Sequence, residues 1–130
     1  MNHILNIEMC RTNLEMIQQT LDTKCPQEPS QIMEHLNELA SIIGLCAQTN
    51  ASYQYHYQTK MNELLPIAMK MKFPPSLVKD YAMSCMAELA SEVKLIERLG
   101  ASIVHKIDAL RSMLSYEKQE RFATNMQGVR

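Results

Sequence analysis

The sequence lacks residues that several common folds require. It contains no Trp and only three Gly among 130 residues. A turn-rich β sandwich needs more glycine than this, whereas many straight-chain apolar residues favour helices. No two glycines have the spacing of a phosphate-binding loop, and no run alternates apolar and polar residues as a strand would. An all-α fold is therefore expected.

Long apolar runs are also missing. No stretch approaches the roughly 18 consecutive apolar residues that span a bilayer, and no basic region precedes an apolar run near the first residue. We therefore expect no membrane contact and a cytoplasmic location. No C-x-x-C spacing occurs, so the cysteines are expected to be free thiols in a reducing compartment. They are Cys10, Cys25, Cys46 and Cys85.

Apolar residues are plentiful: 46% of the chain is hydrophobic, 21% is charged and the net charge is −1. This composition and length predict one helical domain, residues 1–130, with a single core. The apolar residues include 11 Met, an unbranched side chain that adapts to irregular gaps. A soft, methionine-rich core is expected.

Prolines divide the chain into three helical segments. Apolar residues recur at steps of three and four between these prolines, which is the spacing of one helix face. The pattern predicts helices at about 2–22, 31–72 and 75–122. Pro66 removes one backbone donor and predicts a kink in the second helix. Residues 123–130 are expected to form a frayed tail.

Short connections predict an up-down bundle of three main helices, built on a long hairpin of the second and third. An alternative is a four-helix bundle in which the second helix breaks near Asn50. Gly44 and Gly100 fall close together in the antiparallel pairing of the hairpin. We expect these two glycines to mark a close approach of the two backbones.

The first helix is too short to cover the hairpin. At 1.5 Å per residue it extends about 30 Å, whereas each arm extends about 60 Å. The half at residues 51–99 therefore lacks a third helix, and a large exposed apolar face usually marks an interface. We expect a homo-oligomer there, most simply a dimer, or a protein partner. The interface residues expected are Tyr53, Tyr57, Met61, Leu64, Met69, Met71, Phe73, Tyr81, Met83 and Met86.

The tip of this hairpin is the most basic part of the chain. Residues 60–79 carry four Lys and one Glu, a net charge of +3. Such a patch can contact phosphate or an acidic protein. It lacks arginine, which nucleic-acid proteins favour for bidentate contacts, so nucleic-acid binding is the alternative. The lysines are Lys60, Lys70, Lys72 and Lys79.

Two histidine–carboxylate pairs have helical spacing: His35 with Glu38, and His105 with Asp108. Helix bundles build metal sites from such residues, but these sites need further carboxylates that the pattern does not provide. Whether the two pairs meet is left open. Ser112 follows His105 on one helix without the strained turn of a catalytic serine. We expect no metal, no cofactor and no enzymatic activity.

Residues 103–115, IVHKIDALRSMLS, are followed by Glu117-Lys118 and preceded by FPPS at residues 73–76. These segments resemble small helical proteins of unknown function encoded on bacterial prophages and conjugative elements. The resemblance implies a bacterial or phage origin, a bacterial host cell and an accessory role. It also implies a polar contact surface formed by His105, Asp108, Arg111 and Ser112.

The sequence thus predicts a non-enzymatic helical adaptor or assembly module, an accessory protein that acts through the Met/Tyr-rich half of its hairpin. The alternative is a nucleic-acid-binding accessory protein that uses the basic tip.

Overall fold

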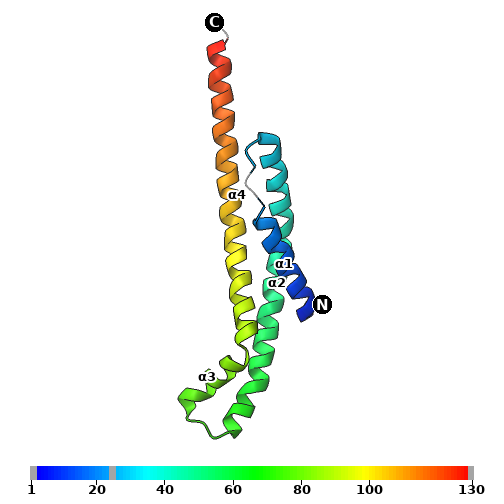
Figure 1. Ribbon diagram of the computed structural model, residues 1–130, viewed down its shortest axis with the longest axis vertical. Helices are drawn as coiled ribbons and strands as arrows, with labels where there is room; N and C mark the ends of the chain where they lie inside the picture. The colour runs from blue at the N-terminus through cyan, green and yellow to red at the C-terminus, as the bar shows by residue number, and fades with distance from the viewer. Residues whose placement is uncertain (1–2, 24–25, 129–130) are drawn as a thin grey trace.

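The computed structural model describes residues 3–23 and 26–128, and the regular structure in these ranges is entirely helical (Figure 1). The prediction of an all-α fold is confirmed. The described ranges contain four helices: α1 (Ile7–Leu21), α2 (Pro29–Lys70), α3 (Pro75–Cys85) and α4 (Ala87–Gly128).

Helix α1 begins later than its apolar pattern predicts. Asn6 caps it by accepting a 2.8 Å hydrogen bond from the backbone N–H of Met9. The preceding Leu5 uses its backbone on α2 instead: its N–H donates to Ser52 Oγ (3.0 Å), and its carbonyl accepts from His56 Nε2 (2.6 Å). These bonds to α2 replace a further helical turn. The expected start at Asn2 lies outside the described residues.

Helix α2 continues without interruption through Asn50 and Pro66, the two positions where the sequence suggests a break or a kink. The alternative break near Asn50 is wrong, because the polar residues beside it bond to the carbonyls four residues back. Thr49 Oγ1 donates to the carbonyl of Leu45 (2.7 Å), and Ser52 Oγ donates to that of Gln48 (2.9 Å). Pro66 lies inside the helix, which ends four residues later at Lys70.

The third predicted helix, residues 75–122, is divided at Met86. Its backbone leaves the helical range there (φ −114°, ψ 21°), although no proline or glycine is near. Met86 is only 3% exposed and packs with Ala82 and Met61, whereas Cys85 is exposed. In the sequence, steps of four from Tyr81 to Leu89 pass through Cys85 rather than Met86. Met86 is buried against α2 in place of Cys85. The irregular backbone at Met86 turns α3 away from the axis of α4 (Figure 1).

Helix α4 continues to Gly128 rather than ending near residue 122. The prediction of a frayed tail from residue 123 is corrected up to this point, and residues 129–130 lie outside the described part of the chain. Figure 1 shows the last turns of α4 extending past the beginning of α2 and past α1. The end of α4 is therefore a single helix within this chain.

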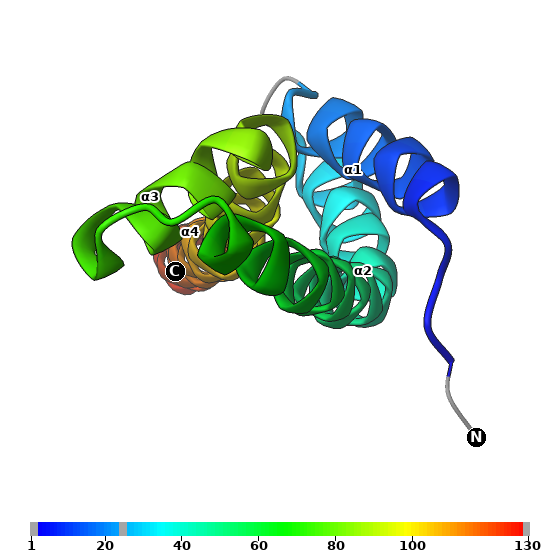
Figure 2. The ribbon, with the colours of Figure 1, turned by 90° about the horizontal axis from the view of Figure 1, so that it is seen from below.

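Helices α2 and α4 form the long antiparallel hairpin, and α1 packs along its middle. The main core combines residues of α1, α2 and α4. Lys106 holds the end of α1, since its Nζ donates to the carbonyls of Leu21 (2.7 Å) and Thr23 (3.1 Å). Figure 2 shows α1 beside α2 at one edge of the bundle and α3 beside α4 at the other edge. The side of the α2–α4 pair away from α1 is open.

The middle of the bundle also contains a charged contact between three helices. Glu92 of α4 accepts a hydrogen bond from Tyr53 of α2 and pairs with Arg11 of α1 at 3.0 Å. Tyr53 is fully buried. This contact fixes the position of α1 along the hairpin.

A second, smaller apolar cluster lies between α2 and α3. It consists of Met61, Ala82 and Met86, with Tyr57, Leu64 and Leu65 packed against it. Tyr57 also packs against the main core. The expectation that residues 51–99 have no covering helix is thus corrected: α3 folds back over the end of α2.

The two glycines of the hairpin are not a matched pair. A Cβ on Gly100 would lie 3.6 Å from Cys46 Sγ, but a Cβ on Gly44 would meet nothing within 4 Å. The predicted close approach at Gly44 is wrong. Among the cysteines, Cys10, Cys46 and Cys85 are free thiols, as expected, and Cys25 lies outside the described residues.

Candidate protein-interaction surfaces

The ten residues expected at an interface fall into three groups. Tyr53, Met61 and Met86 are buried inside the chain, so they are not available to a partner. Tyr57, Leu64 and Tyr81 are half-buried. Met69, Met71, Phe73 and Met83 are exposed. Only this last group, at the turn between α2 and α3, presents an open apolar surface.

We call residues 67–83 the tip surface. It spans the end of α2, the turn and most of α3 at one end of the molecule (Figure 1). Met69 is 67% exposed, the most of any side chain in this group. The exposed large apolar side chains are Ile67, Met69, Met71, Phe73, Leu77 and Met83. Their concentration within one short segment makes the tip surface a candidate interaction site.

The turn holds part of this surface in place. The rings of Phe73 and Tyr81 pack in a tilted contact, with their centroids 5.2 Å apart. Pro74 and Pro75 follow directly and begin α3. Lys72 has φ 60°, a left-handed conformation that is costly for a residue with a Cβ. The chain thus reverses direction through a strained lysine rather than a glycine.

Three of the four lysines expected at the basic tip lie within the tip surface. Lys60 lies further back on α2 and pairs with Glu63 at 3.6 Å. Within residues 3–23 and 26–128, Lys70, Lys72 and Lys79 form no ion pair. The tip surface therefore combines apolar side chains with three unpaired positive charges.

A cavity of about 350 Å³ lies between the beginning of α1, α2 and the junction of α3 with α4. Its charged lining includes Arg11 and Lys60, and each of them forms an ion pair within the chain. Arg11 pairs with Glu92 (3.0 Å), and Lys60 pairs with Glu63. Both cations of this cavity therefore have a carboxylate partner within the chain.

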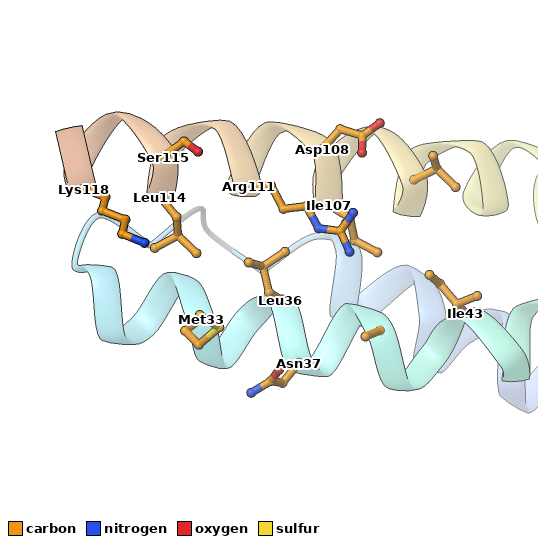
Figure 3. A pocket seen from close by; sticks show the side chains of 12 residues that line it. Met33, Leu36, Asn37, Ile43, Ile107, Asp108, Arg111, Leu114, Ser115 and Lys118 are labelled. Carbon is orange, nitrogen blue, oxygen red and sulfur yellow. The ribbon is translucent and has the colours of Figure 1, made fainter.

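The sequence prediction missed a larger hollow on the open side of the hairpin. It is a groove of about 710 Å³ between the first part of α2 and the second part of α4 (Figure 3). Its apolar lining includes Met33, Leu36 and Ile43 from α2. Arg111 and Lys118 of α4 point toward α2 across the groove (Figure 3).

The groove continues in both directions. A hollow of about 330 Å³ shares Ile43 and Val104 with it and leads toward the middle of the hairpin. A second hollow of about 330 Å³ shares Ser115 and Lys118 and reaches Phe122. One open face thus follows α4 from the middle of the bundle to its projecting end.

The expected polar contact surface is only partly assembled. His105, Asp108, Arg111 and Ser112 are all exposed. Asp108 and Arg111 line the groove, whereas His105 and Ser112 do not. Ser112 Oγ donates to the backbone carbonyl of Asp108 at 3.0 Å. Asp108 and Arg111 therefore belong to the groove, and His105 and Ser112 lie outside it.

The two histidine–carboxylate pairs belong to different surfaces. His35 is 4% exposed, and its Nδ1 lies 3.3 Å from Glu38 Oε2. Both residues line a small hollow beside Thr23, whereas Asp108 lines the α2–α4 groove. Across residues 3–23 and 26–128, no group of three His, Cys, Asp or Glu side chains is arranged to hold a metal ion.

The signal for the groove was present in the sequence. Val104, Asp108, Arg111, Ser115 and Lys118 are separated by alternating steps of four and three residues. Most of them are polar, so a search for apolar periodicity followed the neighbouring core stripe instead. The groove residues of α4 lie on the flank of its core stripe, and Ile107 and Leu114 belong to both.

No protein-family model matches the chain, and comparison with curated proteins and with solved structures gives no match. In the described part of the chain, no helix has the length and apolar character needed to cross a bilayer.

Proposed function

We propose that this protein is a non-enzymatic helical adaptor that binds a partner protein through its tip surface. The observation that carries this proposal is the set of six exposed large apolar side chains within residues 67–83. Methionine side chains adapt to partners of different shape, and the unpaired lysines favour acidic residues around the contact. The partner that fits this chemistry is an amphipathic helix with apolar residues on one face and carboxylates at its edges.

The resemblance of residues 73–76 and 103–115 to small prophage and conjugative-element proteins supports an accessory role of this kind in a bacterial cytoplasm. A second candidate function is nucleic-acid binding. Lys70, Lys72 and Lys79 favour it because they have no ion-pair partner in the described ranges. The exposed methionines between them favour a protein instead.

A site-specific photocrosslinking experiment tests the proposal in the full-length chain. The photoreactive residue replaces Leu77 in the tip surface or, as a matched control, the similarly exposed Met16 on α1. Host-cell extract provides the partner. We expect one acidic protein to be crosslinked from position 77 and not from position 16. Met71→Ser and Met83→Ser should abolish the product, whereas Met9→Ser on α1 should not.

Equal crosslinking from both positions, or none from position 77, would contradict the proposal. Duplex DNA and single-stranded RNA are tested in parallel by titration at increasing salt. Binding that falls steeply with salt, and that Lys70→Glu and Lys79→Glu remove, would support the nucleic-acid function.

A further inference from the structure

The open side of the hairpin contains a regular line of residues that the monomer does not use. The line follows α4 with alternating steps of four and three, which is the spacing of a coiled-coil seam. All of its residues line the groove or the hollow that continues it. They are Val104, Asp108, Arg111, Ser115, Lys118 and Phe122. We call this line the α4 seam.

We propose that two copies of this chain pair antiparallel through their α4 seams, so that α4 of each copy lies in the α2–α4 groove of the other. The two-fold axis passes level with residue 113. The inference does not depend on the tip surface, which stays free in this arrangement. The reason for choosing a second copy as the occupant is that the seam is complementary to itself.

The self-complementarity follows from the order of the residues. The steps between them read the same in both directions, so an antiparallel copy places every seam residue level with another. Apolar residues then meet at the two ends, and opposite charges meet in the next layers. The layers are Val104 with Phe122, Asp108 with Lys118, and Arg111 with Ser115. A parallel pairing would instead place Asp108 against Asp108 and Lys118 against Lys118.

The projecting end of α4 supports the same arrangement. Every described side chain from Lys118 to Asn125 is exposed, including Phe122 at 67%. A helical end without tertiary contacts is only marginally stable in water. In the proposed dimer this end packs in the groove of the second copy, where Phe122 covers Val104 and Ile43, both exposed in the monomer. One contact thus covers both the projecting helix and the empty groove.

Charge-reversal variants of the full-length chain test the pairing by sedimentation equilibrium. Asp108→Lys places two lysines in one layer, and Lys118→Asp places two aspartates there. Each single variant should weaken dimerisation by at least about tenfold. The double variant Asp108→Lys/Lys118→Asp restores opposite charges and should dimerise like the unmodified chain.

A mixture of the two single variants gives the most specific result. The antiparallel layers then match lysine with aspartate at both positions, so the two singles should form a heterodimer with an affinity close to that of the unmodified chain. Met71→Ser at the tip surface is the control and should leave dimerisation unchanged. Circular dichroism confirms that each variant is folded.

The proposal is overturned by any of three results. The first is that the unmodified chain sediments as a monomer throughout the micromolar range, or as an oligomer larger than a dimer. The second is that the single variants dimerise normally. The third is that they lose dimerisation without recovery in the double variant and the mixture. A loss of dimerisation in Met71→Ser alone would place the interface at the tip surface instead.

Discussion

The phenol hydroxyl of Tyr53 donates a 2.8 Å hydrogen bond to Oε2 of Glu92. Arg11 approaches the same carboxylate from α1, with Nε 3.0 Å from Oε2 and a second nitrogen 3.0 Å from Oε1. Three helices therefore meet at one carboxylate. The Glu92 side chain is 14% exposed, so water takes little part in this contact.

Replacing this carboxylate should destabilise the bundle. Glu92→Gln keeps the shape of the side chain but removes its charge, so it loses the paired contact with Arg11. We expect the free energy of unfolding in urea to fall by about 1–2 kcal/mol. Glu97→Gln is the matched control, because Glu97 is exposed and accepts one bond from Gln54 (2.9 Å). Equal losses in both variants would show that the three-helix contact adds no stability.

Alkaline pH should weaken the same contact. Burial, and then the hydrogen bond to Glu92, raise the pKa of Tyr53 above its usual value. Above about pH 10 the unfolded chain releases this proton while the folded chain keeps it, so stability falls as the pH rises. The stability advantage of the unmodified chain over Tyr53→Phe should shrink by about 1.4 kcal/mol per pH unit there.

Urea unfolding of both proteins between pH 8 and pH 11, under reducing conditions, measures this difference. Burial also raises the pKa of Cys10 and Cys46, so the comparison with Tyr53→Phe is needed to isolate the phenol. Parallel pH curves for the two proteins would contradict the assignment.

At the strained turn, by contrast, a substitution should increase the stability of the protein. Lys72 has φ 60°, which glycine adopts without a steric penalty. Lys72→Gly should therefore raise the free energy of unfolding by up to about 1 kcal/mol. Lys70→Gly, inside the last turn of α2, should lower it instead. The sign of the two changes in urea unfolding is the test, and a loss of stability in Lys72→Gly would contradict it.

Gly44 provides a further stabilising substitution. A Cβ there meets nothing within 4 Å, and glycine inside a helix costs about 1 kcal/mol relative to alanine. Gly44→Ala should raise the thermal midpoint. Gly100→Ala should raise it by a similar amount, since its Cβ would lie in ordinary van der Waals contact with Cys46 Sγ at 3.6 Å. A lower midpoint for Gly44→Ala would show that another backbone approaches Gly44 closely.

The prolines and the apolar periodicity were sufficient to predict the helical class and the long second helix. Pro29 begins α2 and Pro75 begins α3, as their preset φ angles favour. The polar pair Thr49-Asn50 left a break open, because either residue can cap a helix. The structure shows Thr49 bonded to the carbonyl of Leu45, a choice that local sequence does not determine.

The division at Met86 and the groove were not predicted for different reasons. Met86 carries no helix-breaking signal, and its position follows from packing on Met61, which is a tertiary effect. The groove depends on mostly polar residues such as Asp108 and Arg111, which apolar periodicity does not register. The exposure of Met69, Met71, Phe73 and Met83 could be predicted because they lie at the end of the hairpin that α1 is too short to reach.

The separation of the two apolar clusters has a consequence for local unfolding. Helix α3 is held by Met61, Ala82 and Met86, whereas residues such as Ile96 and Ile103 belong to the main core. Opening α3 would expose the small cluster and leave the large one intact. Its amides should therefore exchange with deuterium sooner than those of the main core. A partner that remodels α3 would disturb only the smaller of the two cooperative units.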